Sequence, residues 1–96
     1  MQKKQAETLG DVLNQYMKAL GLENKIKEMR ALNGWEKVVG PVIAKNTFSI
    51  SLSAGILDVK FRSPLVKNEI KMHKTIIIEK LNEIVGEAFI KDLKIR

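Results

Sequence analysis

The sequence predicts one α+β domain, with helices packed on one face of a three-stranded sheet. Two observations carry this prediction. Apolar residues recur every three or four positions through the first half of the chain, which is the spacing of helices. From Thr47 the period changes to two, the spacing of strands, before a further helical run and a short apolar tail. The predicted order is helix, helix, strand, strand, helix, strand.

The first half predicts two helices separated by Gly21, which ends the first. Thr8 followed by Asp11 resembles a capping box at the start of the first helix. The apolar stripe of that helix is Leu9, Val12, Leu13, Tyr16, Met17 and Leu20. The stripe of the second helix is Leu22, Ile26, Met29, Leu32 (or Ala31), Trp35 and Val38 or Val39. Both follow the three-four rhythm of an amphipathic helix.

Gly40-Pro41 marks the joint between the helical half and the strand half. Proline is favoured at a first helical turn, so residues 41–46 are predicted to form one short extra helix. We interpret Trp35, Gly40 and Pro41 as residues of the fold, because a tryptophan on an apolar stripe is more often packed than used to stack a ligand.

A β-hairpin is predicted over residues 47–62, with Ala54-Gly55 as its turn. Phe48, Ile50 and Leu52 alternate with serines, which predicts that these apolar side chains face inward. On the return strand, the residues predicted to face inward are Ile56 or Leu57, Val59 and Phe61, and those predicted to face water are Asp58, Lys60 and Arg62.

The third helix is predicted to begin at Ser63-Pro64, a cap residue followed by a first-turn proline, and to end at Gly86. Its predicted stripe is Val66, Ile70, His73, Ile77, Leu81 and Ile84. Residues 88–96 are predicted to form the third strand. We expect residues 1–8 to be a flexible N-terminus and residues 9–96 to be the single domain.

Composition places the chain among ordinary globular proteins, with 96 residues, 45% hydrophobic and 29% charged. It has no cysteine, which excludes disulfides and thiolate zinc sites and fits a reducing compartment. No apolar run reaches the roughly 20 residues of a membrane span. We therefore expect a cytoplasmic protein without a membrane partner.

Catalysis is hard to build from these residues, so we predict that the protein is not an enzyme. His73 is the only histidine, and neither a nucleophile nor an orienting carboxylate can be assigned beside it. Glu79 and Glu83 share a helix face, but such a pair is normally solvated. No phosphate-binding loop, dinucleotide fingerprint or metal-ligand spacing occurs, so no cofactor and no metal are predicted.

A basic surface is the strongest functional signal, because the formal net charge is +6 and the pI is near 9.7. Lys67, Lys71 and Lys74 share one face of the third helix, and Lys60 and Arg62 precede them on the hairpin. We expect these five to converge on one ridge that binds phosphates. The last strand adds a second basic group: Lys91, Lys94 and Arg96. Aromatic residues are only 5%, and the phenylalanines fit inward positions, which favours backbone contacts over base recognition.

Three segments together resemble the bacterial DciA-like family: W-x-x-V-V-G-x-x-I-A-x-N-T from Trp35, L-S-A-G-I-L-D-V-K from Leu52, and L-N-E-I-V-G from Leu81. The resemblance covers about residues 9–96. It implies a KH-like domain without an ATPase site. It also implies that the protein binds DNA, particularly single-stranded or tailed forms, and assists loading of the replicative DNA helicase.

We therefore expect a non-enzymatic nucleic-acid-binding accessory protein of DNA replication that helps to recruit or load the replicative helicase. Two alternatives remain open. The first is a KH-like protein that binds RNA. The second is a protein adaptor that binds no nucleic acid, supported by Leu65, Met72, Ile76 and Ile78, which lie outside the main stripe of the third helix.

Overall fold

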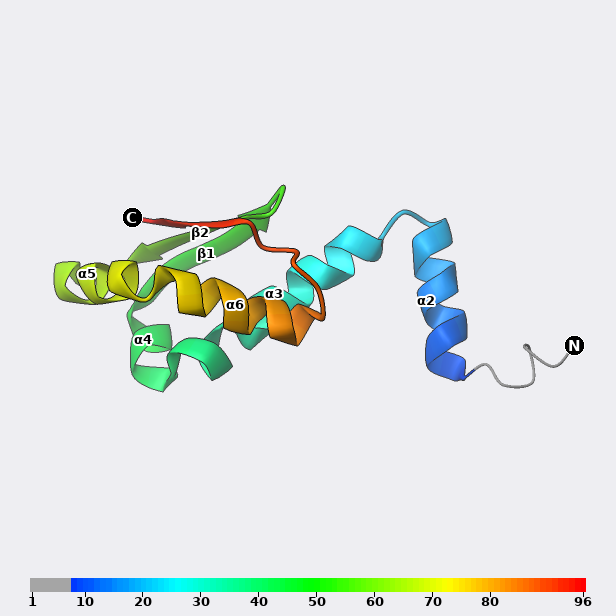
Figure 1. Ribbon diagram of the computed structural model, residues 1–96, viewed down its shortest axis with the longest axis horizontal. Coiled ribbons are helices and arrows are strands. Elements are labelled where there is room, and N and C mark those ends of the chain that lie inside the picture. Colours follow the sequence, from blue (N-terminus) through cyan, green and yellow to red (C-terminus); the bar gives the residue numbers. More distant parts are fainter. Residues whose placement is uncertain (1–7) are drawn as a thin grey trace, which may run out of the picture.

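The computed structural model describes residues 8–96 and confirms the α+β fold class. Its elements are α2 (Leu9–Ala19), α3 (Glu23–Val39), α4 (Pro41–Asn46), β1 (Thr47–Ser53), β2 (Ile56–Phe61), α5 (Pro64–Met72), α6 (Lys74–Val85) and β3 (Asp92–Ile95). The order is the predicted one, with the short α4 at the Gly40-Pro41 joint (Figure 1). The last strand is shorter than predicted, because only Asp92–Ile95 pair with β2.

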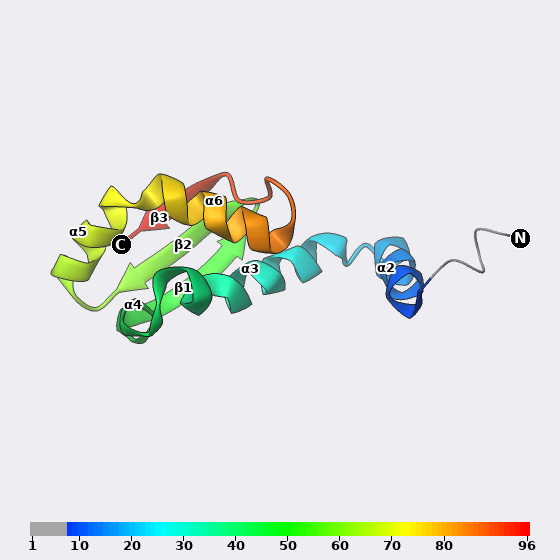
Figure 2. The ribbon, with the colours of Figure 1, turned by 60° about the horizontal axis from the view of Figure 1, so that its bottom comes forward.

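The sheet has the strand order β1-β2-β3. β1 and β2 form the antiparallel hairpin, and β3 runs parallel to β2 because α5 and α6 carry the chain back to the start of the sheet. Helices α3 and α6 pack together on one face of the sheet and leave the other face uncovered (Figures 1 and 2). We call this uncovered side the open face.

The core lies between the sheet and the helices that cover it. Leu57, Val59 and Leu93 are almost completely buried on the inner face, as the alternation of the strands predicts. Leu81 of α6 and Trp35 of α3 close the core from the other side. Trp35 also packs against Phe61, with ring centroids 6.3 Å apart. These contacts confirm that Trp35 belongs to the fold.

The two joints around α4 depend on backbone geometry. Gly40 has φ +89°, a conformation that residues with a side chain rarely adopt, and it lets α3 end and α4 begin at a sharp angle. Pro41 occupies the first position of α4, as predicted. Asn46 ends α4, and its side-chain oxygen accepts a hydrogen bond from the Ser63 backbone N–H at 3.0 Å. The end of α4 is thereby tied to the start of α5.

The prediction of one continuous third helix is wrong at His73. The chain there leaves helical geometry with φ −112° and ψ 16°, and α5 and α6 are separate helices on either side. Ile70, Ile77 and Leu81 are buried as the stripe predicts, and Val85 is buried in place of Ile84. His73 is exposed, and Ile84 is 40% exposed instead of lying in the core.

The molecule measures 58 × 21 × 20 Å. Helix α2 projects beyond the N-terminal end of α3, away from the sheet, and α3 is the helix that it contacts (Figure 1). Its capping box is formed, since Thr8 and Asp11 exchange backbone-to-side-chain hydrogen bonds of 3.1 and 3.2 Å. None of its residues is buried, so the apolar stripe predicted for it is uncovered. Of the segment 1–8 predicted to be flexible, residues 1–7 lie outside the described part of the chain.

Candidate nucleic-acid interface

Strand β1 contains a bulge that turns Phe48 outward. Thr47 pairs with Phe61 and Ser49 pairs with the adjacent Lys60, so Phe48 is one extra residue on the β1 side. An extra residue reverses the alternation: Thr47 faces the helices, whereas Phe48 and Ser49 are both exposed. The prediction that Phe48 faces inward is therefore wrong, and the residue is 59% exposed.

Hydrogen bonds fix the inward side of the bulge. The indole Nε1 of Trp35 donates to the Thr47 hydroxyl at 3.0 Å, and this hydroxyl donates to the Ile43 carbonyl at 2.9 Å. Thr47 therefore connects α3, α4 and β1 through one side chain. Since Thr47 is held toward the helices, the residue that follows it must point to the opposite side of the strand.

Two cations flank the exposed ring of Phe48. Lys60 Nζ and Arg62 Cζ each lie 5.4 Å from the ring centroid, within the range of a cation–π interaction. Both side chains are themselves exposed. The backbone N–H of Arg62 donates to the Asn46 carbonyl at 3.0 Å, which fixes the chain at the end of β2. The result is an aromatic ring between two positive charges at the rim of the sheet.

The basic row continues across the open face to β3. Arg96 lies beside Lys60, because its N–H donates to Val59 and its carbonyl accepts from Phe61. Its guanidinium forms a bidentate ion pair with Asp58, with Nε 3.1 Å from Oδ1. The hydrogen bonds from Arg96 hold the pKa of Asp58 below its ordinary value of 3.8. Lys94 is the register partner of Asp58 and is exposed.

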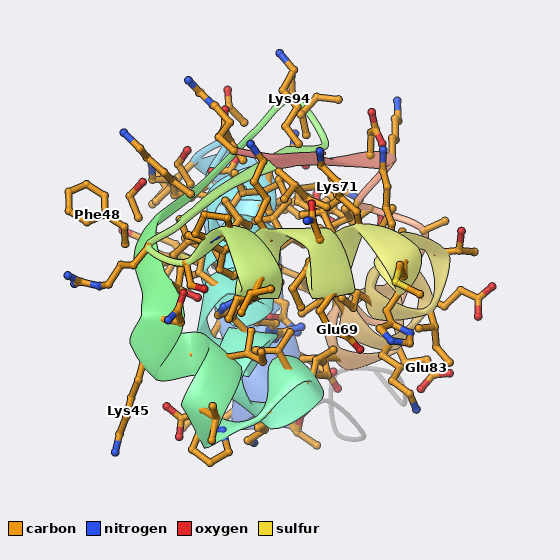
Figure 3. The ribbon with its side chains drawn as sticks, turned by 90° about the vertical axis from the view of Figure 1, so that its left-hand side faces the viewer. Lys45, Phe48, Glu69, Lys71, Glu83 and Lys94 are labelled. Carbon is orange, nitrogen blue, oxygen red and sulfur yellow. The ribbon has the colours of Figure 1, made fainter. Side chains whose placement is uncertain are left out.

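Lys94 also lines a groove of about 390 Å³ between β3 and the junction of α5 with α6. Lys71 and Lys74 line the same groove, and Figure 3 shows Lys71 and Lys94 on the same side of the molecule, away from Glu69 and Glu83. Lys74 pairs with Asp92 at 2.8 Å, and the hydrogen bond from Lys74 lowers the pKa of the Asp92 carboxyl. Lys94 thus joins the open face to the groove.

We call the connected set the basic surface; it comprises Lys60, Arg62, Lys71, Lys74, Lys94 and Arg96. The geometry differs from the single ridge expected from sequence, because Lys60 and Arg62 belong to the open face and Lys71 and Lys74 to the groove. Lys91 lies at the other end of the sheet, packed beside Gly55 of the hairpin turn. Lys67 is half-buried on the first turn of α5.

Sequence patterns missed Phe48 and Thr47 as determinants of this surface. Strict alternation places Phe48 inside, and a one-residue bulge leaves no composition signal of its own. The hydrogen-bonding tryptophan twelve residues earlier in the chain could have indicated that Thr47 is the inward residue.

Other kinds of site have less support in residues 8–96. His73 Nε2 lies 3.3 Å from Glu69, and both side chains are exposed, so the pair is a solvated contact on α5. Within the described part of the chain no group of three or more histidine, cysteine or carboxylate side chains could hold a metal ion. Among the same residues, no helix is long and apolar enough to cross a membrane.

Comparisons with known proteins agree with the sequence resemblance. A family model described as "Dna[CI] antecedent, DciA" matches residues 8–95. A UPF0232 protein of Rhodococcus jostii is 30% identical over 89 residues, which are 93% of this chain and 47% of the relative. UPF0232 proteins of Mycobacterium leprae and Mycolicibacterium smegmatis are each 27% identical over 93% of this chain, covering 47% and 46% of those relatives. The chain therefore spans about half the length of the curated relatives it matches.

Proposed function

The chain belongs to the DciA family, and from this premise we propose that it is a non-enzymatic accessory protein of bacterial DNA replication. In this proposal it binds nucleic acid through phosphate contacts and helps to recruit or load the replicative DNA helicase. Membership supports the replicative role, and the surface described above supports the contact with a polyanion.

The connected basic surface is the single observation that carries nucleic-acid binding. Its six cations follow a path from Arg62, just after β2, across the open face to Lys74 at the groove. Two carboxylates interrupt this path, Asp58 and Asp92, and each is paired with a cation. Clustered cations raise the local concentration of a polyanion and release its counterions on binding. Binding of this kind depends strongly on salt and little on sequence.

The uncovered apolar stripe of α2 supports a protein partner. Leu9 is 75% exposed and Tyr16 is 60% exposed, and Val12, Leu13 and Leu20 lie on the same face. An amphipathic helix of this kind recognises a partner by burying its apolar face in a groove. We assign this face to the helicase contact, and it lies at the other end of the molecule from the basic surface (Figure 1).

One experiment tests both contacts. The protein is titrated into labelled single-stranded DNA, matched RNA and duplex DNA at two salt concentrations, with and without purified replicative helicase. The proposal expects DNA binding that weakens as salt rises, together with retention of the helicase. A clear preference for RNA would instead favour an RNA-binding protein. Helicase retention without any salt-dependent binding would favour a protein adaptor.

Variants separate the two surfaces. Leu13→Ser with Tyr16→Ser on α2 is expected to reduce helicase retention and leave DNA affinity unchanged. Lys71→Glu with Lys94→Glu is expected to reduce DNA affinity and leave helicase retention unchanged. Loss of both activities in either double variant, with folding intact, would contradict the assignment of separate surfaces.

A further inference from the structure

We propose that Phe48 is a stacking platform for one unpaired base of a single-stranded nucleic acid. This inference rests on the proposed nucleic-acid binding and assigns to one position of that surface a contact with a base. The chemistry follows from the ring and its surroundings.

The exposure of Phe48 is built into the strand. Regular alternation would place this side chain in the core, and the bulge at Thr47–Ser49 moves it to the opposite side. Bulges that re-aim a side chain are common next to functional sites. The inward position is occupied by Thr47, whose hydroxyl is already hydrogen-bonded to Trp35 and Ile43. Because Thr47 occupies the inward position, the core has no vacant site for the Phe48 side chain.

The neighbours of the ring suit a nucleotide. Lys60 and Arg62 lie close enough to contact the phosphates on either side of a base that is stacked on Phe48. Arg62 can also stack its guanidinium plane on a base. The outward residues that follow on β1, Ser49 and Ser51, are small and exposed. A base that stacks on the ring takes the place of one of the two cations that lie over it, and both cations are on long, exposed side chains that can move aside to a phosphate.

The geometry selects against a regular duplex. Bases in a duplex are stacked on each other and cannot present a face to a protein ring, whereas bases of a single strand can. A strand that places one base on Phe48 can continue across β2 to Arg96 and Lys94, about 10 Å away at two interstrand spacings. Phe48 thus supplies a preference for unpaired nucleic acid that phosphate contacts alone cannot provide.

The test compares four proteins on probes with equal numbers of phosphates. The proteins are the wild type, Phe48→Leu, Phe48→Trp and Met29→Ala. Met29 is the control, because it is an exposed apolar residue on α3, outside both proposed binding surfaces, and is 55% exposed against 59% for Phe48. The probes are a 12-nucleotide thymidine strand, its abasic counterpart and a 12-nucleotide uridine strand, and the readout is the dissociation constant at one salt concentration.

We expect the wild type to bind the thymidine strand about 5- to 150-fold more tightly than the abasic strand. Phe48→Leu should remove most of this ratio, whereas Phe48→Trp and Met29→Ala should keep it. The uridine strand shows whether RNA bases are stacked equally well. Equal binding of base-bearing and abasic strands by the wild type would overturn stacking and leave phosphate binding intact. Absence of binding to every strand would overturn the proposed function as well.

Discussion

The Trp35 indole donates a hydrogen bond of 3.0 Å to the Thr47 hydroxyl, and this contact links the core of the domain to its outer surface. Trp35 is 4% exposed and packs with Phe61, so it is a rigid anchor. Because Thr47 is held inward at the bulge, Phe48 points outward between Lys60 and Arg62. A buried residue thereby determines the shape of the candidate binding surface.

Thr47→Val tests this link. Valine has nearly the same shape but leaves the Trp35 N–H without an acceptor, which should lower the free energy of unfolding by about 1–3 kcal/mol. Denaturation with urea, followed by circular dichroism, measures the effect. Thr75→Val is the matched control, since Thr75 is exposed on α6 and should change stability little. Equal stabilities for the wild type and Thr47→Val would show that the hydrogen bond does not stabilise the fold.

Gly34→Leu tests the close approach of α3 to α6. A Cβ atom at Gly34 would lie 2.9 Å from Ile84 Cδ1 and 3.2 Å from its Cγ2, so a larger side chain must displace Ile84 or separate the two helices. We expect a loss of about 1–3 kcal/mol of unfolding free energy. Gly10→Leu on α2 is the control, because its Cβ would meet only the Thr8 hydroxyl at 3.6 Å. If the unfolding free energy of Gly34→Leu equals that of the wild type, the contact between α3 and α6 can adjust to the larger side chain without strain.

Asp58→Asn tests the acidic interruption of the basic surface. Removing the carboxylate frees Arg96 from its bidentate ion pair and removes a charge that repels phosphate. We expect tighter binding to single-stranded DNA, with the slope of log affinity against log salt steeper by up to about one unit. Glu79→Gln, the same change of charge at an exposed position of α6, should have a smaller effect. If Asp58→Asn instead binds single-stranded DNA more weakly than the wild type, Arg96 does not belong to the binding surface.

The same ion pair predicts a dependence of stability on pH. Because the pKa of Asp58 in the folded protein lies below its ordinary value of 3.8, the pair stabilises the fold above that pH. The contribution is lost as the pH falls through the lowered pKa. Titration of the Asp58 carboxyl by nuclear magnetic resonance should give a midpoint below 3.8, and Arg96→Gln should raise it toward that value. A midpoint unchanged by Arg96→Gln would show that the pair is absent in solution.

Periodicity was sufficient to predict the order of the elements and most of the core. The positions of Gly21, Gly40 and Gly86 at the ends of helices followed from local chemistry, and all three have positive φ. The first residue of the last strand and the break at His73 were not predictable in this way, because both depend on what the segments pack against. Nothing in the sequence between Pro64 and Val85 signals the break, since neither glycine nor proline occurs there after Pro64.

The candidate site was predicted in composition but not in arrangement. Lys71 and Lys74 line the same groove, but from two separate helices and not from one helix face as the spacing predicts. The groove that they share with Lys94 depends on the parallel pairing of β3 with β2. The partners of Lys74 and Arg96, Asp92 and Asp58, become neighbours only when the sheet forms. The exposure of Phe48 depends on one extra residue in a strand, and the alternation of apolar and polar residues does not reveal such a bulge.

The salt dependence of DNA binding by a charge-reversed open face tests the central claim most directly. Lys60→Glu with Arg62→Glu is compared with Lys25→Glu with Lys37→Glu, an equal change of charge at exposed positions of α3. We predict that the open-face variant loses at least about tenfold in affinity at low salt and about two units of the salt slope. The α3 variant should lose much less. Equal losses in the two variants would show that net charge, and not this surface, binds the nucleic acid.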